Sequence, residues 1–466
     1  MIQKLVYILI FLFVCPTLNY ATVIEGLEPD YANRTIPFYS YSDPITKNKK
    51  DLFSIQIESD GRFSTQVDIK ETTVCYADFD VYSGMLILEP DKNIAIKLPR
   101  LKIKTFSEEK NPYFKPTQMW IKVASDDNEE INQVCYNFEK QYNELIDKNF
   151  NQLYFRQSKL VLDSVTVTLK SGFQKFHHPF IKNLIHFKLK VLEGEVLRQN
   201  QDKALIGVKA SDFTYFNPGF IDILDRVFTN KLVFESNSIN GNDIRNIINK
   251  GDLFGLKEFV QEKYELQPGV DELVILKLLH DAYYSGNFSK QAILSMLNND
   301  LYKKNKNPQL RKFATSIHDK LLYLSPGTLA PEICLPNMVN ETICTSQGEK
   351  YKYVMFVDME IQICREHLKY LPEISKKYQN KLDIFVIIKN PKSKKIQDFI
   401  HTYNIKAEIL FDTDYGKKYT IKSYPSCFLF GKKHKVLMNP AKSPLDGFEN
   451  QFRDFLKNEL FKQNQR

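Results

Sequence analysis

The sequence is poor in cysteine, glycine and tryptophan for its length. Its 466 residues include 7 Cys, 17 Gly, 20 Pro and 1 Trp. So little glycine and proline excludes a fibrous or low-complexity chain, and so few cysteines exclude a small fold held together by disulfides. Hydrophobic residues make up 43% of the chain, which is enough to form folded cores. We therefore expect a globular protein of roughly two or three domains.

An excess of one charge is also lacking. The 64 basic residues exceed the 56 acidic ones only enough for a net charge of +8, and both signs are scattered along the chain. The sequence contains no arginine-rich arm, no zinc-finger spacing and no glycine-rich aromatic RNA-binding motif. These absences argue against nucleic-acid binding.

Long apolar runs are missing after the first twenty residues. Lys4 is followed by the uncharged run Leu5–Val14 and by a short polar stretch that ends at Ala21. This order is typical of a secretory signal peptide over residues 1–21, cleaved after Ala21. We therefore expect an exported protein of the periplasm or cell envelope, with no transmembrane span in the mature chain. A lipid anchor at Cys15 is the less favoured alternative, because Val14 stands where such sites have a small residue.

Short strands dominate the first part of the mature chain. The runs 51–58 and 62–69 are joined at residues 59–61, Ser-Asp-Gly, which is a hairpin signal, and residues 94–99 alternate between apolar and other side chains. We predict a β-rich, sandwich-like N-terminal domain over residues 22–105.

The apolar period then becomes helical. Residues from 131 to 145 repeat at steps of three and four, and the apolar segment 271–284 ends at Ser285-Gly286 before restarting after Ser289. This pattern predicts a central all-α domain over residues 106–326.

Strands and helices alternate in residues 327–466, which predicts a C-terminal α/β domain with a central sheet. The expected strands are 353–357, 382–388, 408–411, 427–430 and 435–438, and the expected helices are 364–378, 394–403 and 448–460. A short hairpin over 333–344 precedes them.

Three local features carry a family resemblance. Residues 329–332, Leu-Ala-Pro-Glu, resemble the entry to the first hairpin of redoxin domains, and Tyr424-Pro425 stands before an apolar strand, where that fold has a cis-proline. The segment 356–364 has the length and position of the turn into the Cys-x-x-Cys helix. The domain thus resembles the TlpA-like thioredoxin-like domains of bacterial (Bacteroidota-type) envelope thiol-disulfide oxidoreductases. The resemblance implies a thioredoxin-like fold, with Tyr424 and Pro425 facing residue 361 along a groove for extended peptides.

The catalytic motif of that family is degenerate here. The motif reads Ile361-Gln362-Ile363-Cys364, so Ile361 occupies the position of the nucleophilic cysteine. An isoleucine cannot ionise, and the two-thiol exchange cycle needs both cysteines. Cys364 remains as the one candidate catalytic thiol at the motif. A helix start and the nearby His367 favour its ionisation, whereas burial at the resolving position opposes it.

Two further cysteines lie on the predicted hairpin. Cys334 and Cys344 are equally distant from its centre, so facing strand positions bring them within bridging distance, and export favours oxidation. We predict a structural disulfide, with a switchable redox pair as the alternative. Cys427 is interpreted as a core residue, and Cys75 and Cys135 are left unpaired. No residue cluster has the spacing of a metal site, and no cofactor motif is present.

Two functions remain open. The first is a non-catalytic thioredoxin-fold module that binds extended peptides or envelope proteins or acts structurally. The alternative is a thiol-disulfide oxidoreductase that works through Cys364 alone or through the pair Cys334 and Cys344.

Overall fold

The computed structural model describes residues 22–124, 130–198, 201–238, 241–412 and 415–464. The signal peptide expected over residues 1–21, with Cys15, lies outside the described residues. The chain divides into two compact units. The N-terminal unit comprises Met1–Ile103 and Lys115–Ala314, and the C-terminal unit comprises Lys104–Phe114 and Thr315–Arg466.

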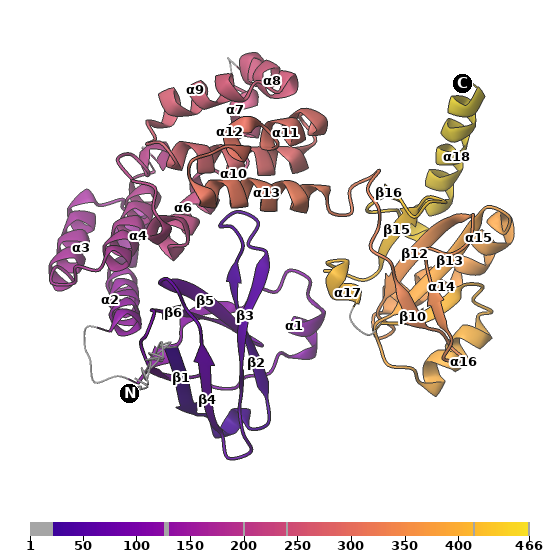
Figure 1. Ribbon diagram of the computed structural model, residues 1–466, viewed down its shortest axis with the longest axis horizontal. Coiled ribbons are helices and arrows are strands. Elements are labelled where there is room, and N and C mark those ends of the chain that lie inside the picture. The colour runs from indigo at the N-terminus through magenta and orange to yellow at the C-terminus, as the bar shows by residue number, and fades with distance from the viewer. Residues whose placement is uncertain (1–21, 125–129, 199–200, 239–240, 413–414, 465–466) are drawn as a thin grey trace, which may run out of the picture. The chain divides into compact units, whose positions relative to one another are not determined.

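The N-terminal unit begins with two sheets (Figure 1). One sheet has the strand order β4-β1-β7-β9 and the other the order β3-β2-β5-β6-β8. The strands are β1 (Thr22–Leu27), β2 (Thr35–Tyr41), β3 (Lys49–Gln56), β4 (Arg62–Val67), β5 (Thr73–Phe79), β6 (Tyr82–Leu88), β7 (Ile94–Lys97), β8 (Thr117–Trp120) and β9 (Lys122–Val123).

The turn expected at residues 59–61 is present, but the two strands beside it do not pair with each other as a hairpin would. Gly61 φ is +87°, and its N–H donates to the Glu58 carbonyl at 3.0 Å, so the tight turn exists. However, β3 pairs with β2 and β4 pairs with β1, and the two strands belong to different sheets. The turn therefore carries the chain from one sheet to the other, which a local turn signal does not reveal.

The N-terminal five-stranded sheet, β3-β2-β5-β6-β8, is buried on both faces. Phe38 and Leu86 share one buried cluster with Phe63 of the four-stranded sheet. On the other face, Tyr76 and its neighbours pack against helical residues such as Phe138. Burial on both faces explains why nearly every residue of β6 is buried instead of every second one.

Helices make up the rest of this unit. They are α2 (Ile131–Phe150), α3 (Lys159–Gly172), α4 (Pro179–Leu197), α5 (Asp212–Tyr215), α6 (Pro218–Val227), α7 (Lys231–Ser236), α8 (Gly241–Lys250), α9 (Leu253–Tyr264), α10 (Val270–Ser285), α11 (Lys290–Leu297), α12 (Asp300–Lys303) and α13 (Pro308–Leu322), the last of which continues into the C-terminal unit. The expected stop and start are confirmed: α10 ends before Gly286, which has φ +74°, and the Ser289 side chain accepts a hydrogen bond from the Ala292 N–H at the start of α11.

Two short strands, β8 and β9, lie in the stretch that the sequence assigned to the helical region. They add to the edges of the two sheets, where Trp120 and Val123 become buried. Strands of four and two residues are too short to show a period of their own.

The C-terminal unit contains a five-stranded sheet with the order β14-β13-β12-β15-β16. Strands β12, β13 and β14 are parallel, whereas β15 and β16 are antiparallel to their neighbours. The elements are α1 (Phe106–Lys110), β10 (Cys334–Pro336), β11 (Thr342–Cys344), β12 (Tyr351–Val357), α14 (Gln362–Lys369), α15 (Leu371–Tyr378), β13 (Leu382–Ile388), α16 (Lys394–Thr402), β14 (Glu408–Phe411), α17 (Tyr415–Lys418), β15 (Ser426–Phe430), β16 (Val436–Met438) and α18 (Phe448–Asn464).

The helix expected over residues 364–378 is two helices. α14 ends at Lys369 and α15 begins at Leu371, with Pro372 in its first turn. Proline has no N–H to donate to the preceding turn and its ring clashes there, so a continuous helix ends before it.

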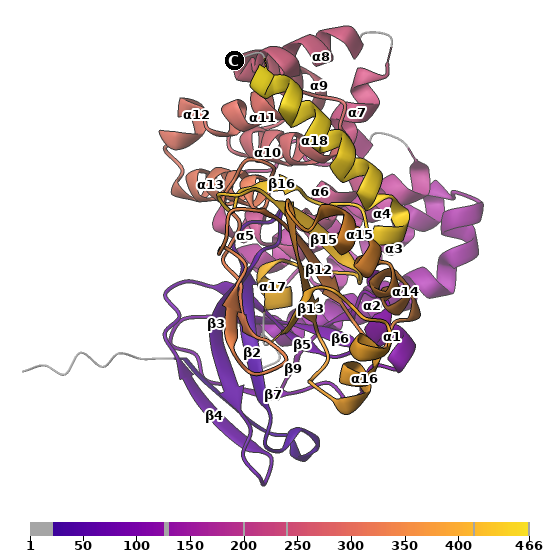
Figure 2. The same ribbon diagram turned by 90° about the vertical axis from the view of Figure 1, so that its right-hand side faces the viewer.

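The central strand β12 separates two buried clusters. Tyr353 and Met355 face the cluster that contains Cys364, whereas Val354 and Phe356 face the cluster of the β10–β11 hairpin. Helix α18 contributes Phe448 and Phe452 to the first cluster, and its later turns extend beyond the sheet (Figures 1 and 2).

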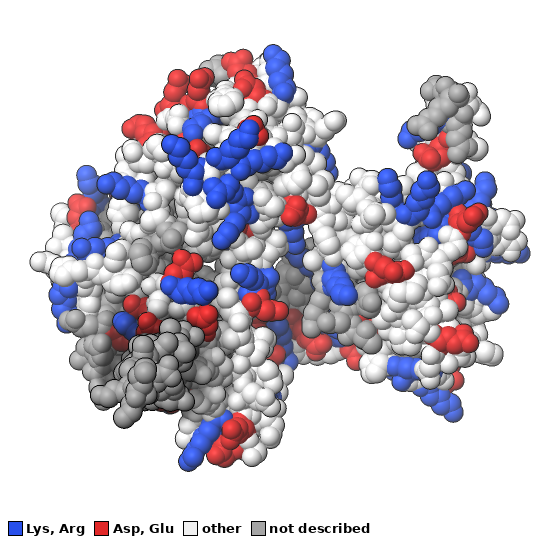
Figure 3. Space-filling model, viewed as in Figure 1, with Lys and Arg blue, Asp and Glu red and all other residues white. Residues whose placement is uncertain are grey.

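On the face in Figure 3, basic and acidic side chains are interspersed over each unit. Among the described residues, no helix combines the length and the apolar character that a bilayer crossing requires.

Candidate functional site

The turn from β12 into α14 places Ile361 at the N-cap of that helix. The Ile361 N–H donates a hydrogen bond to the Asp358 carbonyl at 3.1 Å, and its side chain is half-buried against the Cys364 cluster. An aliphatic side chain therefore stands at the helix start, where the resembling redoxin domains have their nucleophile. It offers neither a thiolate nor a capping oxygen.

Cys364 lies in the first turn of α14 and is fully buried. Burial raises the pKa of its thiol to about 11. At neutral pH the residue is therefore a protonated thiol inside the core, and thiolate is the form that attacks disulfides.

His367 gives Cys364 no positive charge. The side chain is buried, and its Nδ1 accepts a hydrogen bond from the Leu445 N–H at 3.1 Å. Burial lowers the pKa of His367 although the Asp446 carboxylate opposes this, so burial disfavours the charged imidazole. The sequence argument that His367 would favour ionisation of Cys364 is therefore wrong.

Tyr424 and Pro425 lie directly before β15. The peptide bond between them is cis, as the resemblance implies. Tyr424 packs against the cluster that contains Cys364 and Ile361. Burial, and then the nearby carboxylates Asp412 and Asp358, raise the pKa of Tyr424 to about 12. The structure thus brings together Ile361, Cys364 and Tyr424.

Cys334 and Cys344 form a disulfide on the β10–β11 hairpin. The two residues are directly paired across the strands with their Cα atoms 4.1 Å apart, which confirms the predicted bridge. Ile333 and Leu335 of the hairpin pack in the cluster on the opposite face of β12 from Cys364. The disulfide and Cys364 are therefore not parts of one dithiol centre.

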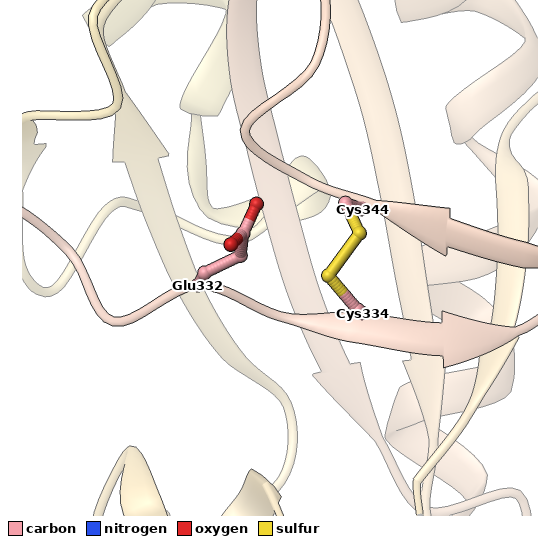
Figure 4. Close-up of side chains that lie close together, drawn as sticks. All are labelled: Glu332, Cys334 and Cys344. Carbon is pink, nitrogen blue, oxygen red and sulfur yellow. A yellow bond between two sulfur atoms is a disulfide. The ribbon is translucent and has the colours of Figure 1, made fainter.

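The carboxylate of Glu332 lies beside this disulfide (Figure 4). The Glu332 oxygen and the two sulfur atoms all lie within 4.8 Å of one another, a grouping that would suit a metal ion. Each sulfur is bonded to the other, so neither is a free thiolate, and the oxidised hairpin offers a metal only the exposed carboxylate.

Sequence reasoning missed the buried carboxylate of Asp358. This residue follows β12 directly and its side chain has no exposure to solvent. Its oxygens accept hydrogen bonds from the Lys110 ammonium group at 2.7 Å and from the Glu360 N–H at 3.0 Å. Burial raises the pKa of Asp358, but these hydrogen bonds outweigh burial and hold that pKa below its ordinary value. The signal was an acidic residue directly after the apolar run Tyr353–Val357.

The cations that neutralise Asp358 carry no local sequence signal. Lys110 comes from helix α1, and Lys389 follows β13 with its ammonium group 3.7 Å from the Asp358 carboxylate. Lys389 also lies over the Tyr424 ring, 5.6 Å from its centroid. The site therefore combines an unreactive Ile361 with a network of charges centred on Asp358.

Strand order, helix placement and the cis-proline together define the fold of the C-terminal unit as thioredoxin-like. No protein-family model matches the chain, and no curated protein sequence matches it. Solved structures that resemble part of it include thiol-disulfide oxidoreductases of Bacteroides and a putative thiol-disulfide interchange protein of Chlorobium tepidum.

Two of these solved structures illustrate the extent of the likeness. The thioredoxin domain of a thiol-disulfide oxidoreductase from Bacteroides vulgatus has 17% identity and a TM-score of 0.26, and the match covers 28% of this chain and 97% of that one. A thiol-disulfide oxidoreductase from Bacteroides fragilis has 17% identity and a TM-score of 0.25, with 28% and 99% covered. Such scores assign neither a reaction nor a substrate to this chain.

Proposed function

We propose that the chain is an exported protein of the cell envelope whose thioredoxin-like domain works as a binding or structural module without dithiol catalysis. The observation that carries this proposal is the pair of residues at the start of α14. Ile361 cannot attack a disulfide, and Cys364 is a buried thiol whose pKa is about 11. A mixed disulfide therefore has neither an accessible nucleophile to form it nor a neighbouring thiol to resolve it.

Binding at this site would use the backbone beside Pro425. The hydrogen bonds found among the described residues include none to the N–H or carbonyl group of Tyr424. An extended peptide can pair with such a segment by adding a strand, and this mode needs no reactive residue at position 361. The groove of Tyr424, Pro425 and Ile361 would then bind peptides or envelope proteins in extended form.

An insulin-reduction assay tests the absence of catalysis. With excess dithiothreitol, the natural protein should precipitate insulin no faster than buffer, and Cys364→Ser should change nothing. Ile361→Cys should gain activity, because it restores a thiol at the helix start three residues before Cys364. This gain is the positive control that the remaining site is intact.

The oxidoreductase alternative predicts a different pattern. Turnover by the natural protein that is lost with Cys364→Ser would establish a monothiol enzyme. Turnover that survives Cys364→Ser but needs Cys334 and Cys344 would place the redox centre at the hairpin, whose sulfurs lie on half-buried residues. Either result would overturn the proposal.

A further inference from the structure

The segment Lys104–Phe114, named here the strap, belongs to the C-terminal unit although its neighbours in sequence belong to the other unit. Its helix α1 begins with a capping box, in which the Thr105 N–H donates to the Glu108 carboxylate at 2.9 Å and the Glu108 N–H donates to the Thr105 hydroxyl at 3.3 Å. This box gives the strap a local structure of its own.

Charge, and not apolar burial, holds the strap on its unit. The Lys110 ammonium group lies 2.7 Å from the buried carboxylate of Asp358 and 2.5 Å from the exposed carboxylate of Glu360, and the Lys110 side chain is only 13% exposed. Two of the strap's aromatic side chains behave differently: Phe106 is 63% and Tyr113 is 86% exposed, whereas Phe114 is partly buried. Lys110 is therefore a largely buried strap side chain that is held by ion pairs.

A second ion pair of opposite polarity lies next to the first. The Glu109 carboxylate is 3.8 Å from the Lys389 ammonium group, which in turn lies 3.7 Å from Asp358 and over the Tyr424 ring. Two adjacent strap residues thus pair with opposite charges at the site: Glu109 with Lys389, and Lys110 with Asp358. The contact lies beside Ile361 and Tyr424, the residues of the proposed groove.

We propose that the strap is an internal ligand of this site. Lys110 occupies a position for one ammonium group between the carboxylates of Asp358 and Glu360, and an external partner binds by presenting a lysine from an extended segment in its place. The inference rests on the proposed binding function and names its ligand class, a lysine-bearing extended peptide. It also makes the strap an autoinhibitory element, because the site is occupied until Lys110 leaves.

The exchange is physically balanced because one lysine replaces another. A buried carboxylate needs a cation, and the closest remaining one, Lys389, is 3.7 Å away. An incoming lysine restores the lost pairing while Lys110 becomes hydrated. The strap retains the advantage of an intramolecular ligand, whose effective concentration is on the order of millimolar. A free peptide therefore binds poorly until Lys110 is removed.

The test uses a fluorescent peptide with the sequence of residues 104–114 and the full-length chain. Anisotropy should show that Lys110→Gln protein binds this peptide at least about tenfold more tightly than the natural protein does, because the internal competitor is gone. Lys104→Gln, a change elsewhere in the same strap, should behave like the natural protein. The peptide that carries the Lys110→Gln change should not bind, and adding Asp358→Asn to the Lys110→Gln protein should abolish binding.

Two outcomes would overturn the inference: equal affinity of natural and Lys110→Gln proteins for the peptide, or equal binding of the peptide with and without its lysine. Should Lys110→Gln fail to fold, hydrogen exchange on the natural protein decides. Peptide well above the effective concentration of the strap, which is on the order of millimolar, should speed amide exchange in residues 104–114. The glutamine peptide at the same concentration should not, and unchanged exchange with both would refute displacement. The insulin assay does not depend on the strap. A negative peptide experiment would therefore contradict only the proposed binding mode, and turnover of insulin would contradict only the absence of catalysis.

Discussion

The ammonium group of Lys110 lies 2.7 Å from the buried carboxylate of Asp358, although the two residues are 248 positions apart in the chain. This contact neutralises the buried carboxylate that follows β12, three positions before Ile361. The ion pair, and not a reactive thiol, is the main chemical feature of the site. The first two predictions measure it directly.

Removing the cation should destabilise the C-terminal unit. Lys110→Gln should lower the free energy of unfolding by about 1–3 kcal/mol, because it takes the nearest partner from a buried charge. Lys110→Gln with Asp358→Asn should recover part of this loss, since the buried charge is then gone as well. Urea unfolding of the three proteins, with Lys104→Gln as control, measures the effect. A loss equal to that of the control would show that the ion pair contributes nothing.

The contribution of this ion pair should depend on pH in one direction. The pKa of Asp358 is held below its ordinary value, so its contribution is fully present above the unfolded value and is lost as pH falls through the folded one. The stability difference between natural and Lys110→Gln proteins should therefore be constant from about pH 5 to 8 and should shrink below about pH 4. A difference that grows in acid would contradict this assignment.

The free thiols should resist alkylation in the folded protein. Cys75, Cys135, Cys364 and Cys427 are all buried, and burial raises the pKa of Cys364 and of Cys427 to about 11 each. At pH 8 the thiolate fraction of such a group is on the order of one in a thousand. Intact-mass spectrometry after brief iodoacetamide treatment should show no adduct on these residues without denaturant, and complete labelling with it. Rapid adduct formation on Cys364 would favour the monothiol enzyme.

The hairpin disulfide should stabilise the domain by restricting the unfolded chain. Cys334 and Cys344 are 10 positions apart, and closing such a loop contributes about 2–3 kcal/mol in the chain-entropy model. The double change Cys334→Ser and Cys344→Ser should therefore lower the midpoint of urea unfolding. Dithiothreitol should lower the midpoint of the natural protein but leave that of the double variant unchanged. An equal response of both would mean that another reducible bond matters.

Local patterns in the sequence already determined much of this protein. Alternation of strands and helices predicted the α/β domain, the Ser289 cap predicted the start of α11, and equal spacing about a turn predicted the Cys334–Cys344 bridge. The loss of the nucleophile at Ile361 is likewise visible in the sequence. Each of these features depends on residues that are near one another in the chain.

Only the tertiary structure decided the rest. It separated β3 and β4 into two sheets, buried Cys364 beneath its neighbours, and brought Lys110 to Asp358. Burial and ion pairing between distant residues depend on which surfaces meet after folding. A lysine in a polar segment and an aspartate after a strand show no pattern that links them, so their contact is a property of the folded chain alone.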